Sequence, residues 1–118
     1  MREFTQSEVE YLRSQLLGRI ATVDPRGQPH VVPVGFRYND ETGTIDIGGH
    51  NFEASKKFRN LKANPQVAFV VDDLASVSPW RPRGVIVRGS VAFHEGGGER
   101  FGRGFGDVWI RILPERVI

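Results

Sequence analysis

The fold is decided by the stretch GGHNFEASKKFRNLKANPQVAFVVDD, residues 48–73. Its first half predicts a short helix, because apolar residues recur at helical spacing and an Asn-Pro pair ends the pattern. The buried face of this helix is expected to hold Ala54, Phe58 and Leu61. Its second half, residues 66–73, is a continuous apolar run ending in two acids, which is typical of a strand buried on both faces. A helix therefore interrupts a sheet at this point.

Turns and strand-like runs dominate the rest of the chain. Near the start, Thr5 and Glu8 match a capping box and predict a helix that Gly18 would end. The six expected strands are residues 19–23, 30–38, 44–49, 66–73, 84–95 and 108–113. Six strands separated by turns predict a mostly β, closed or nearly closed antiparallel barrel whose openings are covered by two helices. We expect a single domain over residues 1–118, with a final strand that is cut short at Ile118.

Composition excludes several classes of protein. Sixteen Lys and Arg against fourteen Asp and Glu leave a net charge of +2, which argues against an obligate nucleic-acid binder. The chain has no cysteine, so it has no disulfide, no thiol nucleophile and no thiolate metal ligand. The three histidines lack the spacing of a metal site, and we expect no bound metal. Without an apolar membrane span or a signal-peptide core, a soluble cytoplasmic protein is expected.

Lysines at the start of the second helix are locally unfavourable. The helix dipole favours anions at this end by about 0.3–1 kcal/mol per charge, yet Lys56 and Lys57 place two cations there. Free backbone N–H groups, the hydroxyl of Ser55 and the preceding Gly48-Gly49 pair would suit a phosphate group. The alternative is a basic helix face that contacts only solvent.

Three other features are candidates for function. His50 lies beside this phosphate site, and a turn residue is the simpler interpretation. Trp80 stands in a loop between prolines and arginines, where it could stack on a ligand, form an interface or cover one end of the barrel. Residues 96–106, GGGERFGRGFG, read as a flexible connection or as an Arg-Gly-Phe segment that contacts nucleic acid. No catalytic triad or paired carboxylates are present, so we name no catalytic residue and expect a cofactor to carry any chemistry.

These motifs together resemble a known family. The stretches GRIATVDPRGQPHVVPVGF, TIDIGGHN and SKKFRNLKANPQVAFVVDD are similar to the pyridoxamine 5′-phosphate oxidase-like split-barrel superfamily. The similarity is closest to its branch of deazaflavin-dependent reductases, which use coenzyme F420, and it covers about residues 16–95. It implies a six-stranded, Greek-key split β-barrel of the kind that binds flavin mononucleotide. It also implies a homodimer with the cofactor in a groove at the subunit interface.

The resemblance further implies which residues bind the cofactor. The phosphate is matched to Ser55, Lys56 and Lys57. The ring and its side chain are matched to Val32, Pro33, Val34, Gly48, Gly49, His50 and Asn51, with Trp80 as a further candidate. True pyridoxamine phosphate oxidases carry a basic residue near the position of residues 31–33, and this chain has none there. That departure disfavours vitamin B6 oxidation and favours the deazaflavin over flavin mononucleotide.

The expected function is therefore hydride transfer from reduced coenzyme F420 to a small unsaturated organic substrate. One alternative keeps the barrel but uses flavin mononucleotide as the cofactor. Another is a non-catalytic protein that binds a flavin or a tetrapyrrole. A further alternative is a single-stranded nucleic-acid-binding barrel that uses Phe36, Tyr38 and residues 96–106, against which the small net charge argues.

Overall fold

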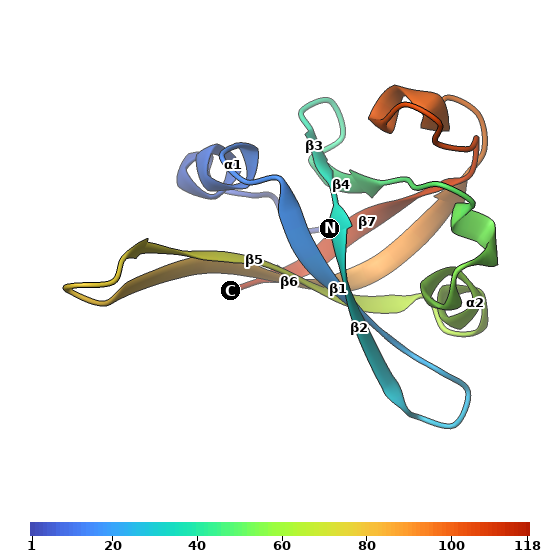
Figure 1. The fold of residues 1–118 in the computed structure, drawn as a ribbon, viewed down its shortest axis with the longest axis horizontal. Helices are drawn as coiled ribbons and strands as arrows, with labels where there is room; N and C mark the ends of the chain where they lie inside the picture. Colours follow the sequence, from blue (N-terminus) through green and yellow to red (C-terminus); the bar gives the residue numbers. More distant parts are fainter.

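A computed structural model describes all 118 residues, and Figure 1 shows a curled sheet with helices at its margins. The helical elements are α1 (Gln6–Arg13), α2 (Lys56–Ala63) and the 3-10 turns η1 (Phe52–Ala54) and η2 (Gly98–Phe101). The strands are β1 (Leu17–Val23), β2 (Pro29–Gly35), β3 (Arg37–Asn39), β4 (Thr44–Ile47), β5 (Gln66–Ser76), β6 (Arg81–His94) and β7 (Trp109–Val117). Neither α-helix has the length and hydrophobicity that a membrane-spanning helix needs.

The seven strands form one antiparallel sheet in the order β2-β1-β5-β6-β7-β4-β3. The two edge strands, β2 and β3, are separated in the chain only by Phe36. The sheet must therefore curl until its edges approach each other, which confirms the mostly β split barrel. The expected strand 30–38 was wrong in one respect. The chain breaks at Phe36 and continues on the opposite edge, so the sheet has seven strands instead of six.

Buried aliphatic and aromatic side chains from both helices and six of the strands fill the interior. Helix α2 covers one end of the barrel with Leu61, which is fully buried. The buried side-chain amide of Asn60 on the same helix donates to the hydroxyl of Thr22 on β1 at 3.0 Å. The expectation that Ala54 lies on the buried face is wrong, because Ala54 is exposed at the end of η1 and Phe52 packs into the core instead.

The first helix confirms its predicted start and corrects its predicted end. Thr5 and Glu8 form both hydrogen bonds of a capping box. The helix stops at Arg13, however, and Gly18 lies inside β1. A Cβ atom at position 18 would overlap the ring of Phe69. Gly18 is therefore required for strand packing and does not terminate the helix.

The β5–β6 hairpin is longer than the sequence suggested and projects from the body of the barrel (Figure 1). Both strands continue into the expected loop 76–84, which is reduced to residues 77–80. The expectation that residues 66–73 are buried on both faces is wrong for the single chain. The burial of their side chains alternates, with Phe69 buried and Val70 only partly buried. Val70 stays partly exposed because no element of the same chain covers the outer face of β5.

A buried carboxylate joins three strands. Asp46 of β4 is 1% exposed and receives two hydrogen bonds from Arg111 of β7, at 3.0 and 3.2 Å. The Asn39 amide of β3 and the Thr44 hydroxyl each donate to the same carboxylate at 3.0 Å. The Asp46 carboxylate is therefore fully paired, which is the condition under which a buried charge is tolerated.

A second polar cluster attaches α1 to the β5–β6 hairpin. The hydroxyl of Tyr11 donates to Asp73 at 2.8 Å, and Arg83 donates two hydrogen bonds to the same carboxylate. The guanidinium of Arg83 also lies 5.3 Å from the centre of the Tyr11 ring. Burial and the hydrogen bond to Asp73 raise the pKa of Tyr11 to about 12.

We expect Asp46→Ala to lower the free energy of unfolding by about 3–5 kcal/mol, because it leaves Arg111 without its partner. Urea denaturation followed by circular dichroism measures the change. The matched control is Asp40→Ala, which removes the exposed pair between Asp40 and Arg13 and should change stability little. Equal effects of the two substitutions would contradict the structural role of Asp46.

The raised pKa of Tyr11 predicts a stability loss at high pH. The unfolded chain releases this proton near pH 10, whereas the folded chain keeps it to about pH 12, so stability falls across that interval. Tyr11→Phe removes this contribution. The difference in unfolding free energy between the wild type and Tyr11→Phe should be constant below pH 10 and shrink above it. A difference that does not change with pH would show that Tyr11 titrates as in the unfolded chain.

Candidate functional site

Helix α2 begins with an uncovered set of backbone N–H groups. Ser55 is its N-cap, accepting from the N–H of Phe58 at 3.3 Å and donating to the carbonyl of Phe52 at 2.7 Å. Its hydroxyl is therefore occupied by capping, and Ser55 would have to rotate its hydroxyl away from Phe52 to donate to a phosphate oxygen. The N–H groups of Lys56 and Lys57 precede the first intrahelical acceptors and have no partner within the helix.

The two lysines of this turn differ in environment. Lys56 is exposed, whereas Lys57 is partly buried and its Nζ lies 5.1 Å from the centre of the Phe52 ring. Burial lowers the pKa of Lys57, because desolvation disfavours the ammonium form. No carboxylate compensates it, since none of the five ion pairs includes Lys57. This ammonium group, next to free N–H groups, is suited to bind an anion.

The connection from β4 to α2 holds the glycine and histidine candidates. Asn51 adopts a left-handed conformation with φ of 49° and starts η1. His50 donates from Nδ1 to the carbonyl of Gly104 at 3.0 Å. Its ring packs edge-on against the Phe105 ring, with the ring centres 4.6 Å apart. In this structure, His50 therefore holds residues 98–106 in place.

We define residues 96–106 as the flap. The sequence suggested a flexible connection, but the flap contains η2 and folds back over the β4–α2 connection. A Cβ atom on Gly48 would lie 3.1 Å from Phe101 and 3.3 Å from Phe105. Gly48 is thus needed for close approach, as expected, but two phenylalanines of the flap occupy the space. The backbone N–H of Gly106 also donates to the carbonyl of Gly49 at 3.2 Å.

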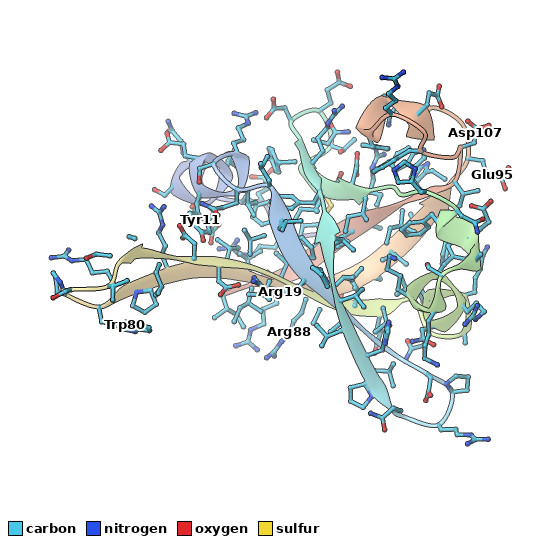
Figure 2. All side chains as sticks on the ribbon, viewed as in Figure 1. Tyr11, Arg19, Trp80, Arg88, Glu95 and Asp107 are labelled. Carbon is cyan, nitrogen blue, oxygen red and sulfur yellow. The ribbon has the colours of Figure 1, made fainter.

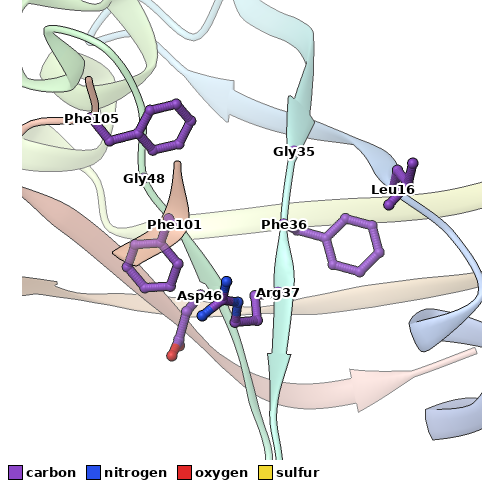
Figure 3. A pocket seen from close by; sticks show the side chains of 8 residues that line it. All are labelled: Leu16, Gly35, Phe36, Arg37, Asp46, Gly48, Phe101 and Phe105. Atoms are coloured by element: carbon purple, nitrogen blue, oxygen red, sulfur yellow. The ribbon is translucent and has the colours of Figure 1, made fainter. Parts of the chain in front are cut away.

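A pocket of about 230 Å³ opens where the two edges of the sheet approach each other. Figure 3 shows Phe36 and Leu16 on one side and the flap residues Phe101 and Phe105 on the other. Arg37 and Asp46 supply its only charged side chains. Of the lining residues, the sequence predicted Gly48 for a cofactor site and offered Phe36 only for nucleic-acid binding, and it did not point to Leu16, Gly35, Arg37 or Asp46. The Gly-Phe spacing of the flap was the one available signal, since glycine next to phenylalanine permits close ring packing.

The remaining candidates lie apart from this pocket. Val32, Pro33 and Val34 belong to the edge strand β2, with Val34 buried and Pro33 exposed on the opposite face. The side chains of all three cannot face one ligand, but the unpaired edge of β2 offers backbone groups to it. Trp80 is 66% exposed at the tip of the β5–β6 hairpin, far from α2 (Figures 1 and 2). Within one chain, Trp80 does not join the other candidates.

Comparison with known proteins places this geometry in a family. A reductase from Streptomyces rimosus, named 5a,11a-dehydrotetracycline/5a,11a-dehydrooxytetracycline reductase, is 44% identical over 98% of this chain and 81% of its own length. A solved structure described as an F420 reductase has a TM-score of 0.72 and 25% identity over 100% of this chain and 98% of its own. The FAD-binding protein of Mycobacterium smegmatis has a TM-score of 0.71 and 22% identity, with 99% and 94% coverage, and shows the fold alone.

The match to a family model is equally extensive. The model described as pyridoxamine 5′-phosphate oxidase matches residues 4–113. This range includes the whole sheet up to the middle of β7, both helices, the flap and every candidate residue. The chain belongs to the pyridoxamine 5′-phosphate oxidase family.

Proposed function

We propose that the protein is a dimeric cytoplasmic oxidoreductase that uses coenzyme F420 to reduce a small unsaturated organic substrate. The observation that carries the cofactor proposal is the partly buried ammonium of Lys57, which has no carboxylate partner in the chain. The similarity to a reductase of dehydrotetracyclines and to an F420 reductase supports the reaction class. It also favours a polycyclic, conjugated ketone as the substrate.

The residues of the chain fit a phosphate-bearing cofactor with a flat ring. Lys57 and the first N–H groups of α2 would hold the phosphate, with Lys56 adding charge from the exposed side. Lys57 and Gly49 both pack against the buried ring of Phe52, since the Lys57 ammonium lies 5.1 Å from the ring centre and a Cβ atom on Gly49 would lie 3.2 Å from the ring. The cofactor ring and its side chain would lie along the unpaired edge of β2 and would reach Gly48 only when Phe101 and Phe105 of the flap move aside.

The reaction needs little from the protein beyond orientation. When bound, reduced coenzyme F420 would supply a hydride, and an unsaturated ketone would accept it at the β-carbon. A solvent proton would complete the saturated product at the α-carbon, so the substrate gains two electrons and the cofactor loses two. The aromatic side chains around the pocket would exclude water and orient the substrate.

The dimer proposal rests on an uncovered apolar face. A shallow hollow on the outer surface of β2, β1, β5 and β6 is lined by Ala21, Val31, Ala68, Phe69, Val70 and Ile86, with Arg19 as its one charged side chain. Val31 is 63% exposed and Ile86 is 39% exposed. An exposed apolar patch on a sheet is one mark of a subunit interface. We propose that a second copy covers this face, which would also explain the apolar residues on the outer side of β5.

The cofactor proposal predicts micromolar binding of coenzyme F420 in a fluorescence titration, with weaker binding of flavin mononucleotide. Lys57→Ala should weaken binding by about 2 kcal/mol, roughly thirtyfold in Kd, because it removes a charge-assisted hydrogen bond. The matched control is Lys62→Ala, which removes the same charge from the last turn of the helix, away from the proposed phosphate site. There the Lys62 ammonium lies 4.3 Å from the centre of the Phe93 ring. Failure to bind either cofactor would end the proposal, and binding without turnover of enones would indicate a carrier.

The interface proposal predicts a dimer in sedimentation equilibrium. Val31→Glu should shift the wild-type dimer to monomer, because a charge would be buried in the apolar contact. The control is Ala63→Glu, which adds the same charge at the exposed end of α2, away from the proposed interface. A monomeric wild-type protein, or a dimer that Val31→Glu leaves intact, would rule out this interface.

A further inference from the structure

We propose that the pocket between Phe36 and the flap is the substrate site, and that it takes a flat conjugated ring system with an anionic oxygen at one edge. The inference deepens the proposed function and rests on it for the assignment as a substrate site. It concerns Arg37, Phe36, Phe101 and Phe105, none of which belongs to the phosphate site at α2.

The walls of the pocket are aromatic and well supported. The ring of Phe36 packs edge-on against buried Phe69, with the ring centres 5.4 Å apart. On the other side, the ring centres of Phe101 and Trp109 are 5.2 Å apart, and Phe101 packs closely on Gly48. Figure 3 shows the space between these two sides. A flat ring between aromatic walls buries both of its faces at little conformational cost.

Leu16 extends the same wall toward solvent. It is 85% exposed, which is more than any other large apolar side chain of the protein. Its position on the pocket rim means that a bound ring would cover it. The pocket is therefore completed by an apolar ligand body, not by a small polar metabolite.

The charged side chains of the pocket determine which polar group a ligand should carry. Asp46 is neutralised by the paired hydrogen bonds from Arg111. Arg37 forms no ion pair, and its one hydrogen bond goes to the carbonyl of Arg100 at 3.1 Å. The pocket thus presents one unbalanced positive charge. In the adjoining hollow, Asp40 is paired with Arg13, and Glu41 lies on the β3–β4 turn.

A guanidinium with free N–H groups defines the chemistry that it binds. Its planar donors match two oxygens of a carboxylate, or the adjacent oxygens of an ionised hydroxy-ketone. The Arg37 guanidinium also stacks 5.5 Å from the centre of the Phe101 ring, which keeps it near the aromatic wall. An ionised hydroxy-ketone fused to flat rings would satisfy Arg37 and the aromatic walls at once.

The flap can adapt to such a ligand. Gly96, Gly97 and Gly104 have φ between 80° and 88°, so glycine hinges lie before Phe101 and between Phe101 and Phe105. Outside its own turns, few hydrogen bonds hold the flap closed, among them those to Gly49 and His50. Small movements at these hinges would widen the pocket without disturbing the sheet.

The test compares two naphthoquinones of similar size by isothermal titration calorimetry. Lawsone carries a hydroxyl group that is ionised at neutral pH, and menadione carries a methyl group in its place. The wild-type protein should bind lawsone about 10- to 100-fold more tightly than menadione. Arg37→Gln should abolish that preference, weakening lawsone binding far more than menadione binding. The control Arg26→Gln, at the exposed β1–β2 turn, should keep the preference.

Two further results decide the inference. Phe105→Ala should weaken the binding of both compounds, because it removes one aromatic wall. The titrations are run without cofactor and with oxidised coenzyme F420. If the cofactor fails to bind but Arg37 still selects lawsone, this site stands and the proposed cofactor falls. If the cofactor binds but lawsone binds no more tightly than menadione, or Arg37→Gln changes nothing, the inference is overturned.

Discussion

The continuity of the chain through Phe36 constrains the whole structure. β2 and β3 lie at opposite edges of a seven-stranded sheet, yet a single residue joins them. A flat sheet could not satisfy that connection, so the sheet curls and its edges meet around Phe36. The edges are not hydrogen-bonded to each other, and the barrel stays split at this point. The pocket lies at this split because the edges leave both a gap and unpaired backbone groups there.

The split has to be closed by something other than strand pairing. The flap performs this role on one side, where Phe101 and Phe105 pack over Gly48. The buried bridge between Asp46 and Arg111 supports the floor by joining β4 to β7. Because Asp46 is paired internally, Arg37 is the one charged side chain of the pocket lining that has no ionic partner. Pairing Asp46 with Arg111 thereby leaves Arg37 as the charge by which the proposed substrate site would select its ligand.

Local signals in the sequence predicted local structure. The capping box of Thr5 and the Asn-Pro stop after α2 depend on neighbouring residues, and both are found. Gly18 is set by its contact with Phe69, and the break at Phe36 is set by which strands pair; both depend on residues distant in the sequence, so spacing alone could not reveal them. Contacts between distant residues also limited what could be predicted of the candidate site. The lysines of α2 stood out through their conflict with the helix dipole, whereas the pocket residues come from four separate segments that only the curled sheet brings together.

The proposed site holds two cations that have no carboxylate partner, and they define its two ends. Lys57 is partly buried at the start of α2, and Arg37 lies on an edge strand at the pocket. The surface between them is formed by the β4–α2 connection and the aromatic flap, and it carries no exposed acid that pairs with either cation. An anionic cofactor tail and an anionic substrate edge would therefore be held at opposite ends. Their neutral rings would be forced together between those ends, which is the arrangement that hydride transfer requires.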